Sequence, residues 1–106
     1  MTQFDLSAPP IHPGEVIKNE IGYNKISQRS LAKDIGMSYS ALNELLNARR
    51  PLTIEVALRV EAALGLRADI LMRIQLKYDL YQARHNPQLS QQIDSVKYIG
   101  TIPFPA

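Results

Sequence analysis

Short polar side chains recur at helical spacing between residues 38 and 47 of this 106-residue chain. Because residues three or four apart share one face of a helix, these groups would form a single polar surface. Hydroxyl and amide groups on such a surface can hydrogen-bond base edges in the major groove of DNA, where asparagine pairs bidentately with adenine. The spacing therefore predicts a base-reading row made of Ser38, Tyr39, Ser40, Asn43 and Asn47.

No lysine or arginine stands between Ser38 and Asn47, so the cations that hold a DNA backbone would have to come from flanking segments. Phosphate groups are commonly held by basic loops and by the first turns of helices. The candidates for phosphate contact are Gln28, Arg29, Lys33, Arg49, Arg50 and Thr53. A polar helix face and a solvated Arg-Arg loop also occur in helical proteins that bind other proteins, so a protein-interaction module stays an alternative.

Patterns for catalysis or metal binding do not emerge from the sequence. The chain contains no cysteine, which excludes disulfides, thiol nucleophiles and cysteine-based zinc sites. His12 and His85 have no helical ligand spacing to each other, and no paired carboxylate joins them. Serine and glycine do not stand in a nucleophile-elbow or phosphate-loop context. We therefore expect no enzymatic activity, no metal and no cofactor.

The elements that must position the polar row are helices, because apolar residues recur every three or four positions. The predicted helices cover residues 13–21, 28–35, 39–46, 54–64 and 68–84. Serine and threonine stand where a side-chain oxygen can cap three of them. These predicted N-caps are Ser27, Ser38 and Thr53. Glycines mark three of the helix ends. They are Gly22, Gly36 and Gly65.

The second and third predicted helices have the dimensions of a helix-turn-helix. Gly36 ends the first of the pair, where a left-handed backbone conformation is least costly for a residue without a Cβ atom. Ala32 is small at the point where the two helices would pack. The pattern predicts an all-α fold with five helices in one domain. We divide the chain into an N-terminal arm (1–11), this domain (12–84) and an extended C-terminal tail (85–106).

Composition adds limits to this interpretation. The net charge of +2 is too small to indicate a nucleic-acid partner by itself. No run of about 18 apolar residues occurs, and the first residues lack the pattern of a signal peptide. We expect a soluble, cytoplasmic protein.

The core candidates of the fourth predicted helix are Ala57, Leu58, Val60 and Leu64.

The fifth predicted helix has two apolar faces, although a surface helix of a monomer needs only one. One face carries Ile70, Leu71, Ile74, Tyr78 and Tyr81. The other carries Met72, Leu76 and Leu80, and we expect it to meet the same face of a second copy in a two-fold homodimer. The tail is expected to cover part of the remaining apolar surface. Its apolar residues are Val96, Tyr98, Ile99, Ile102 and Phe104.

Four stretches of the sequence resemble a known family. The stretch "SQRSLAKDIGMSYSALNELLNARRPLT" resembles the helix-turn-helix of lambda-repressor-like (XRE) proteins. Before it stands "HPGEVIKNEI" and after it "ALRVEAALG" and "IQLKYDL", which are similar in type and order to HigA-type antitoxins. The similarity covers about residues 12 to 81. It departs in the turn after the third predicted helix, where the family usually has glycine and this chain has Ala48.

The resemblance implies a bacterial antitoxin with a lambda-repressor-like fold. Such a protein would form a homodimer, bind a palindromic operator in double-stranded DNA and repress its own operon. It would also neutralise a HigB-type toxin, a ribosome-dependent mRNA endonuclease. A stand-alone transcriptional regulator without a toxin is the main alternative.

Overall fold

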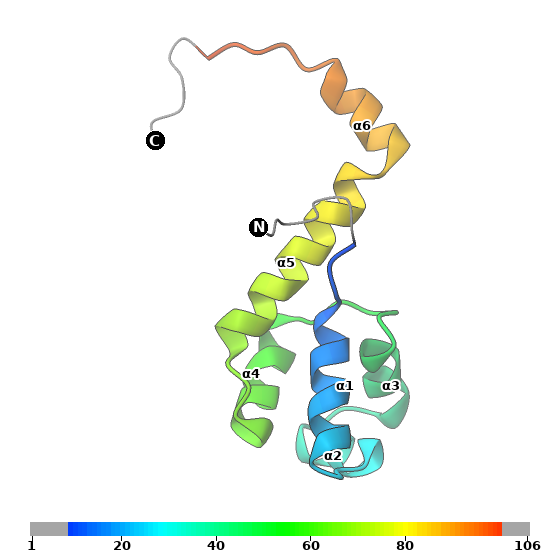
Figure 1. Cartoon of the computed structure of the whole chain (residues 1–106), viewed down its shortest axis with the longest axis vertical. Coiled ribbons are helices and arrows are strands. Elements are labelled where there is room, and N and C mark those ends of the chain that lie inside the picture. Colours follow the sequence, from blue (N-terminus) through cyan, green and yellow to red (C-terminus); the bar gives the residue numbers. More distant parts are fainter. Residues whose placement is uncertain (1–8, 101–106) are drawn as a thin grey trace, which may run out of the picture.

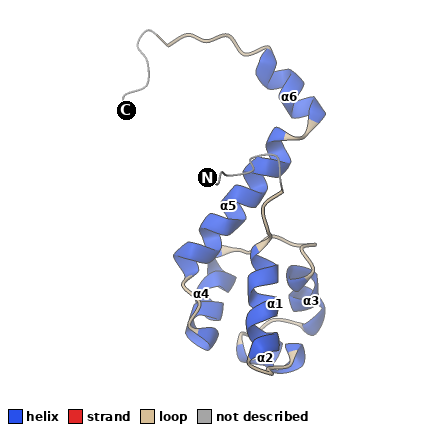
Figure 2. Ribbon diagram, in the orientation of Figure 1, coloured by secondary structure: helices blue, strands red, loops and turns tan. Residues whose placement is uncertain are grey.

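The computed structural model describes residues 9–100, and within this range the chain forms six α-helices and no strand. The helices are α1 (Pro13–Tyr23), α2 (Gln28–Asp34), α3 (Tyr39–Leu46), α4 (Ile54–Leu64), α5 (Ala68–Arg84) and α6 (Pro87–Asp94). Helices α1 to α4 gather into one bundle, whereas α5 starts against the bundle and runs out of it toward α6 (Figure 1). Figure 2 shows that loops join all the helices. The predicted all-α, helix-turn-helix fold is confirmed.

Three helices begin at the predicted side-chain caps. In each case a hydroxyl oxygen accepts a hydrogen bond from the backbone N–H three residues later, at 3.0 Å for Ser27 and Ser38 and at 3.2 Å for Thr53. Each bond satisfies one of the N–H groups that a helix start leaves without a partner, and contributes about 1 kcal/mol. The caps therefore fix where α2, α3 and α4 begin.

Two of the three predicted helix ends are confirmed. Gly36 and Gly65 take the left-handed conformation, with φ of 70° and 77°. The prediction that α1 ends at Gly22 is wrong, because the helix continues to Tyr23. The chain reverses instead at Lys25, which takes φ of 58°. A left-handed lysine costs about 1–2 kcal/mol, so a glycine was the expected residue there.

The core lies between the four helices of the bundle and the first turns of α5. Its buried members are Ile17, Ile21, Leu31, Ala32, Ile35, Leu42, Leu45, Leu46, Leu52, Ala57, Val60, Ala68 and Leu71. The prediction that Leu58 belongs to this core is wrong, since its side chain is 53% exposed. Ile54, one turn earlier, is also exposed. These two residues therefore form an apolar row on the outside of α4.

Helix α6 occupies part of the segment that was predicted to be an extended tail. The Asn86 side-chain oxygen accepts hydrogen bonds from the N–H groups of Gln88 and Leu89, at 3.0 and 3.1 Å. Pro87 fills the first helical position, where its missing N–H costs nothing. In the sequence Pro87 signals the end of α5, but the pair Asn-Pro equally signals the start of another helix.

The tail does not cover the apolar surface of its own domain in the part that the structure describes. Val96, Tyr98 and Ile99 are 73%, 68% and 85% exposed. The physical reason is that α5 and α6 carry this segment away from the bundle (Figure 1). Ile102 and Phe104 lie outside the described residues.

Helix α1 approaches α3 closely at Gly14. A Cβ atom built at Gly14 would overlap the backbone carbonyl of Leu45, near the end of α3. We expect Gly14→Ala to lower the free energy of unfolding by about 2 kcal/mol, because backbone has to move to make room. Urea denaturation followed by circular dichroism measures this loss.

Gly22, in the same helix, provides a matched control. A Cβ atom there meets nothing within 4 Å. Gly22→Ala is therefore expected to stabilise the protein by about 0.5–1 kcal/mol, through the helix preference of alanine alone. If the two variants had equal stability, the close approach of α1 to α3 would be refuted.

Candidate nucleic-acid interface

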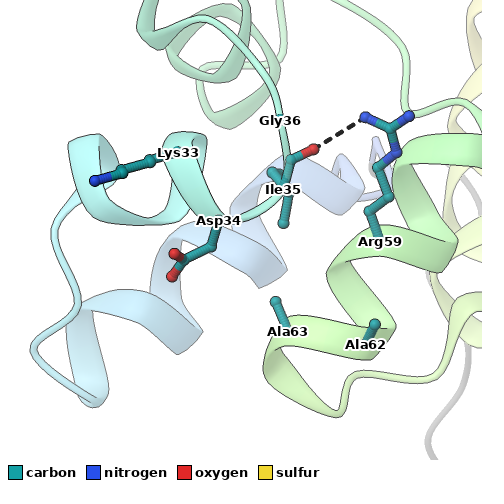
Figure 3. A pocket seen from close by; sticks show the side chains of 7 residues that line it. All are labelled: Lys33, Asp34, Ile35, Gly36, Arg59, Ala62 and Ala63. Carbon is teal, nitrogen blue, oxygen red and sulfur yellow. Dashed lines mark hydrogen bonds between the residues drawn. The ribbon is translucent and has the colours of Figure 1, made fainter.

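The turn between α2 and α3 is braced by an arginine of α4. The Nη1 group of Arg59 donates a hydrogen bond to the Ile35 carbonyl at 3.1 Å, and its Nη2 group pairs with Glu55 at 2.7 Å. A Cβ atom at Gly36 would lie 3.2 Å from Arg59 Nη1. Figure 3 shows Arg59 reaching the turn from α4, while Lys33 points the other way. Arg59 was not among the sequence candidates, because its partner is a backbone carbonyl distant along the chain.

The first turn of α3 lies on the surface, as predicted. Tyr39 is 45% exposed, and Ser40 is exposed beside it. The Ser38 hydroxyl oxygen accepts the capping hydrogen bond of α3. Its O–H group can still donate a hydrogen bond. The Arg29 guanidinium lies 5.1 Å from the centre of the Tyr39 ring, a cation–π contact. A predicted phosphate contact and a predicted base contact are thus brought together from two helices.

Asn43 is oriented by a residue of the supporting helix. Its Nδ2 group donates to Gln28 Oε1 at 3.0 Å, so the two predicted site residues form a pair. Asn47 lies at the other end of α3, where its Nδ2 group donates to the Asn43 carbonyl at 2.8 Å. Lys18 of α1 donates to Asn47 Oδ1 at 3.4 Å. Lys18 is therefore a cation beside α3 that the sequence candidates lacked, because nothing local to α1 signals it.

The remaining candidates for phosphate contact differ in the partners that their side chains already have within the protein. Lys33 and Arg49 are exposed. Arg50 pairs with Glu44 of α3, with N–O distances of 3.0 and 3.2 Å. The Thr53 side chain caps α4. Arg50 would therefore have to exchange a partner in order to hold a phosphate.

The loop after α3 begins with a left-handed alanine. Ala48 has φ of 61°, a conformation that costs an L-residue about 1–2 kcal/mol. The Arg49 N–H donates to the Glu44 carbonyl at 2.8 Å and closes the end of the helix. An alanine therefore takes the left-handed conformation at this turn, where glycine is usual in the family that the sequence resembles.

A buried histidine lies beneath this loop. His12 is 2% exposed, and its Nδ1 atom accepts a hydrogen bond from the Gly14 N–H at 2.9 Å, which caps α1. The pKa of His12 lies below its ordinary value of 6.5, because burial disfavours the charged ring. A hydrogen bond with the Arg50 backbone and the charges of Asp79 and Glu15 act in the opposite direction but are smaller effects. The ring is therefore neutral at neutral pH, as Nδ1 must be to accept. His12 is thus the N-cap of α1, one residue before the predicted start of the first helix.

The side of α5 that faces the bundle completes the surroundings of the loop. The ring of Tyr78 meets the ring of His12 edge to face, with centroids 4.8 Å apart. Gln75 is 4% exposed, and its Oε1 atom accepts a hydrogen bond from the Leu52 N–H at 2.7 Å. Gln75 and Tyr78 belong to the "IQLKYDL" stretch of the resemblance, but nothing in their spacing reveals a partner in the loop.

Metal-binding clusters and membrane-spanning helices are both absent from residues 9–100. No group of three or more histidine, cysteine or acidic side chains in this range could hold a metal ion. None of the helices in the same range is long and apolar enough to cross a membrane.

A capped supporting helix, a braced glycine turn and an exposed polar helix define a helix-turn-helix protein. The chain matches the helix-turn-helix family over residues 24–71. It is 36% identical over 83 residues to virulence-associated protein I of Dichelobacter nodosus, covering 76% of this chain and 75% of that protein.

Two solved structures are similar over most of the chain. One is an addiction module antidote protein of the HigA family from Coxiella burnetii, with a TM-score of 0.74, 28% identity and coverage of 86% of this chain and 100% of that one. The other is the Pseudomonas aeruginosa antitoxin HigA with the higBA promoter, with a TM-score of 0.73, 27% identity and coverage of 83% and 96%. This chain belongs to the helix-turn-helix family of HigA-like, XRE-type antitoxins.

Proposed function

We propose that this chain binds operator DNA through α3 and represses its own operon as an antitoxin. The observation that carries the proposal is the exposed first turn of α3, where the Arg29 guanidinium lies over the Tyr39 ring in a cation–π contact. The similar HigA structure from Pseudomonas aeruginosa contains promoter DNA, which supports the same role here. In this arrangement α3 enters the major groove and the surrounding cations hold phosphates.

Within the predicted row, the side chains at the start of α3 are best placed to read bases. Tyr39 and Ser40 are exposed, and Asn43 is held in one orientation by Gln28. Ser38 and Asn47 each make a capping hydrogen bond, so they have fewer groups left for DNA. We therefore assign base reading mainly to Tyr39, Ser40 and Asn43.

We expect Asn43→Ala to weaken binding to the operator by about tenfold or more, because a bidentate base contact contributes about 1–3 kcal/mol of discrimination. Affinity for a scrambled duplex should change little. Fluorescence anisotropy with both duplexes at one salt concentration measures the two affinities. Gln82→Ala, at an exposed position of α5, is the control. Unchanged operator affinity of Asn43→Ala would contradict the reading row.

Removing a phosphate contact should give a different signature. Arg49→Ala is expected to weaken binding to both duplexes alike and to reduce the slope of log affinity against log salt by about one. Lys97→Ala removes the same charge from an exposed site beyond α6, and should leave the slope near that of the wild type. Equal slopes for the two variants would exclude Arg49 from the interface.

We also propose that the protein is a homodimer formed through the outer part of α5. Leu76 and Leu80 are 58% and 41% exposed, whereas Met72, also predicted in this row, packs partly against the core of its own chain. None of the described residues from 76 to 100 is buried. A two-fold contact here would cover this apolar surface and give two α3 helices a fixed separation, as a palindromic operator requires.

Leu76→Asp tests this dimer, because a carboxylate in the contact would lose its water without gaining a partner. Sedimentation velocity should show a dimeric wild type and a monomeric variant. Gln82→Asp places the same charge on another face of α5 and should stay dimeric. A Leu76→Asp variant that remains a dimer would move the contact elsewhere, and a monomeric wild type would refute the homodimer.

A HigB-type mRNA endonuclease is the toxin that we propose the chain neutralises. The support is its membership of the HigA-like family, which includes an antidote protein of an addiction module. Adding the purified chain to such a toxin, encoded beside it, should suppress mRNA cleavage on translating ribosomes at equimolar amounts. Continued cleavage would favour the alternative of a stand-alone regulator.

A further inference from the structure

The loop between α3 and α4 carries Arg49 and Arg50, yet its own hydrogen bonds hold only its beginning. The N–H groups of Ala48 and Arg49 donate to carbonyls of α3, at 3.1 and 2.8 Å. Pro51, two residues after Arg49, has no N–H to donate. The position of the second half of the loop therefore depends on groups outside it.

Gln75 of α5 supplies one of these groups. Its Oε1 atom accepts from the Leu52 N–H at 2.7 Å, and its Nε2 atom donates to Asp79 Oδ1 at 2.9 Å. An ionised carboxylate can only accept hydrogen bonds, so the donor end of the Gln75 amide must face Asp79. The acceptor end must then face Leu52. Asp79 thus sets the direction in which Gln75 presents its oxygen to the loop.

His12 holds the loop one residue before Pro51. Its imidazole makes a hydrogen bond with the Arg50 backbone and packs against the ring of Tyr78. His12, the loop and α5 together form a small depression at this point. It is lined by loop residues 48–51 and by His12, Gln75, Tyr78 and Asp79. The loop is therefore held at Arg50 and at Leu52, on either side of its proline.

We propose that Gln75 is a positioning residue for DNA binding: by holding Leu52 it fixes the second half of the loop, so that Arg49, which α3 already holds at its N–H, is fixed from both sides to reach a phosphate. The inference rests on the proposed DNA-binding function. A leucine or methionine would fill the same buried space without a polar group to desolvate. The Gln75 amide instead makes two hydrogen bonds, one to Leu52 and one to Asp79, and so ties Leu52 to α5. Gln75 acts through the loop and touches no DNA itself.

Gln75→Met removes the acceptor while keeping the length of the side chain. Affinity for the operator is expected to fall about tenfold, with a salt slope reduced by about one, because Arg49 is then held only from the α3 side, by its hydrogen bond to the Glu44 carbonyl. The Leu52 amide should also exchange with deuterium faster in the DNA-free protein. A loss of stability alone would not change the salt slope of the folded protein, so the slope separates positioning from folding.

A charge-matched exchange provides the second test. In Gln75→Glu, two carboxylates face each other, and binding should weaken. In the double variant Gln75→Glu with Asp79→Asn, the amide at 79 donates to the carboxylate at 75, which still accepts from Leu52. Net charge equals that of the wild type. The operator affinity should return to within about threefold of the wild-type affinity. The salt slope should return to the wild-type value.

The outcomes divide cleanly. A folded Gln75→Met protein with wild-type affinity and slope would overturn the inference. If that variant does not fold, the double variant decides, and the inference fails if it binds as weakly as Gln75→Glu. A wild-type protein that does not bind its operator would instead refute the proposed function, before any variant is compared.

Discussion

The first turn of α1 is the contact on which the other helices depend. His12 caps this turn through the Gly14 N–H, and the missing Cβ of Gly14 lets α1 rest on the carbonyl of Leu45. The same imidazole meets Tyr78 of α5 and the backbone of Arg50. Because protein interiors are close-packed, a shift of this turn would move α3, the loop after it and α5 together.

Features that depend on neighbours in the sequence could be predicted. Caps such as Ser38 and left-handed glycines such as Gly36 follow from hydrogen bonds or sterics within a few residues. Leu58 could not be placed correctly, because periodicity does not say how much of a helix its neighbours cover. The Asn43–Gln28 and Gln75–Leu52 hydrogen bonds join residues 15 and 23 positions apart, and only the folded arrangement brings them together.

The same chemistry that makes a residue a candidate for reading DNA also makes it a good helix cap. Short hydroxyl and amide side chains bond nearby backbone as readily as bases. Ser38, Asn47 and Thr53 are used in this way at helix ends, while Ser40 stands inside the exposed turn. Sequence spacing predicted which polar residues share the exposed face of α3, but which of them already make hydrogen bonds within the protein depends on the folded chain.

The outer half of α5 and the whole of α6 have a consequence for the lifetime of the protein. An eight-residue helix such as α6 is marginal in water without tertiary packing, and no residue of α6 is buried. Such a segment opens locally at little cost in free energy, and proteases cleave in proportion to the open population. A partner that covers this segment would protect it, so the rate at which the chain is degraded would report whether that partner is bound.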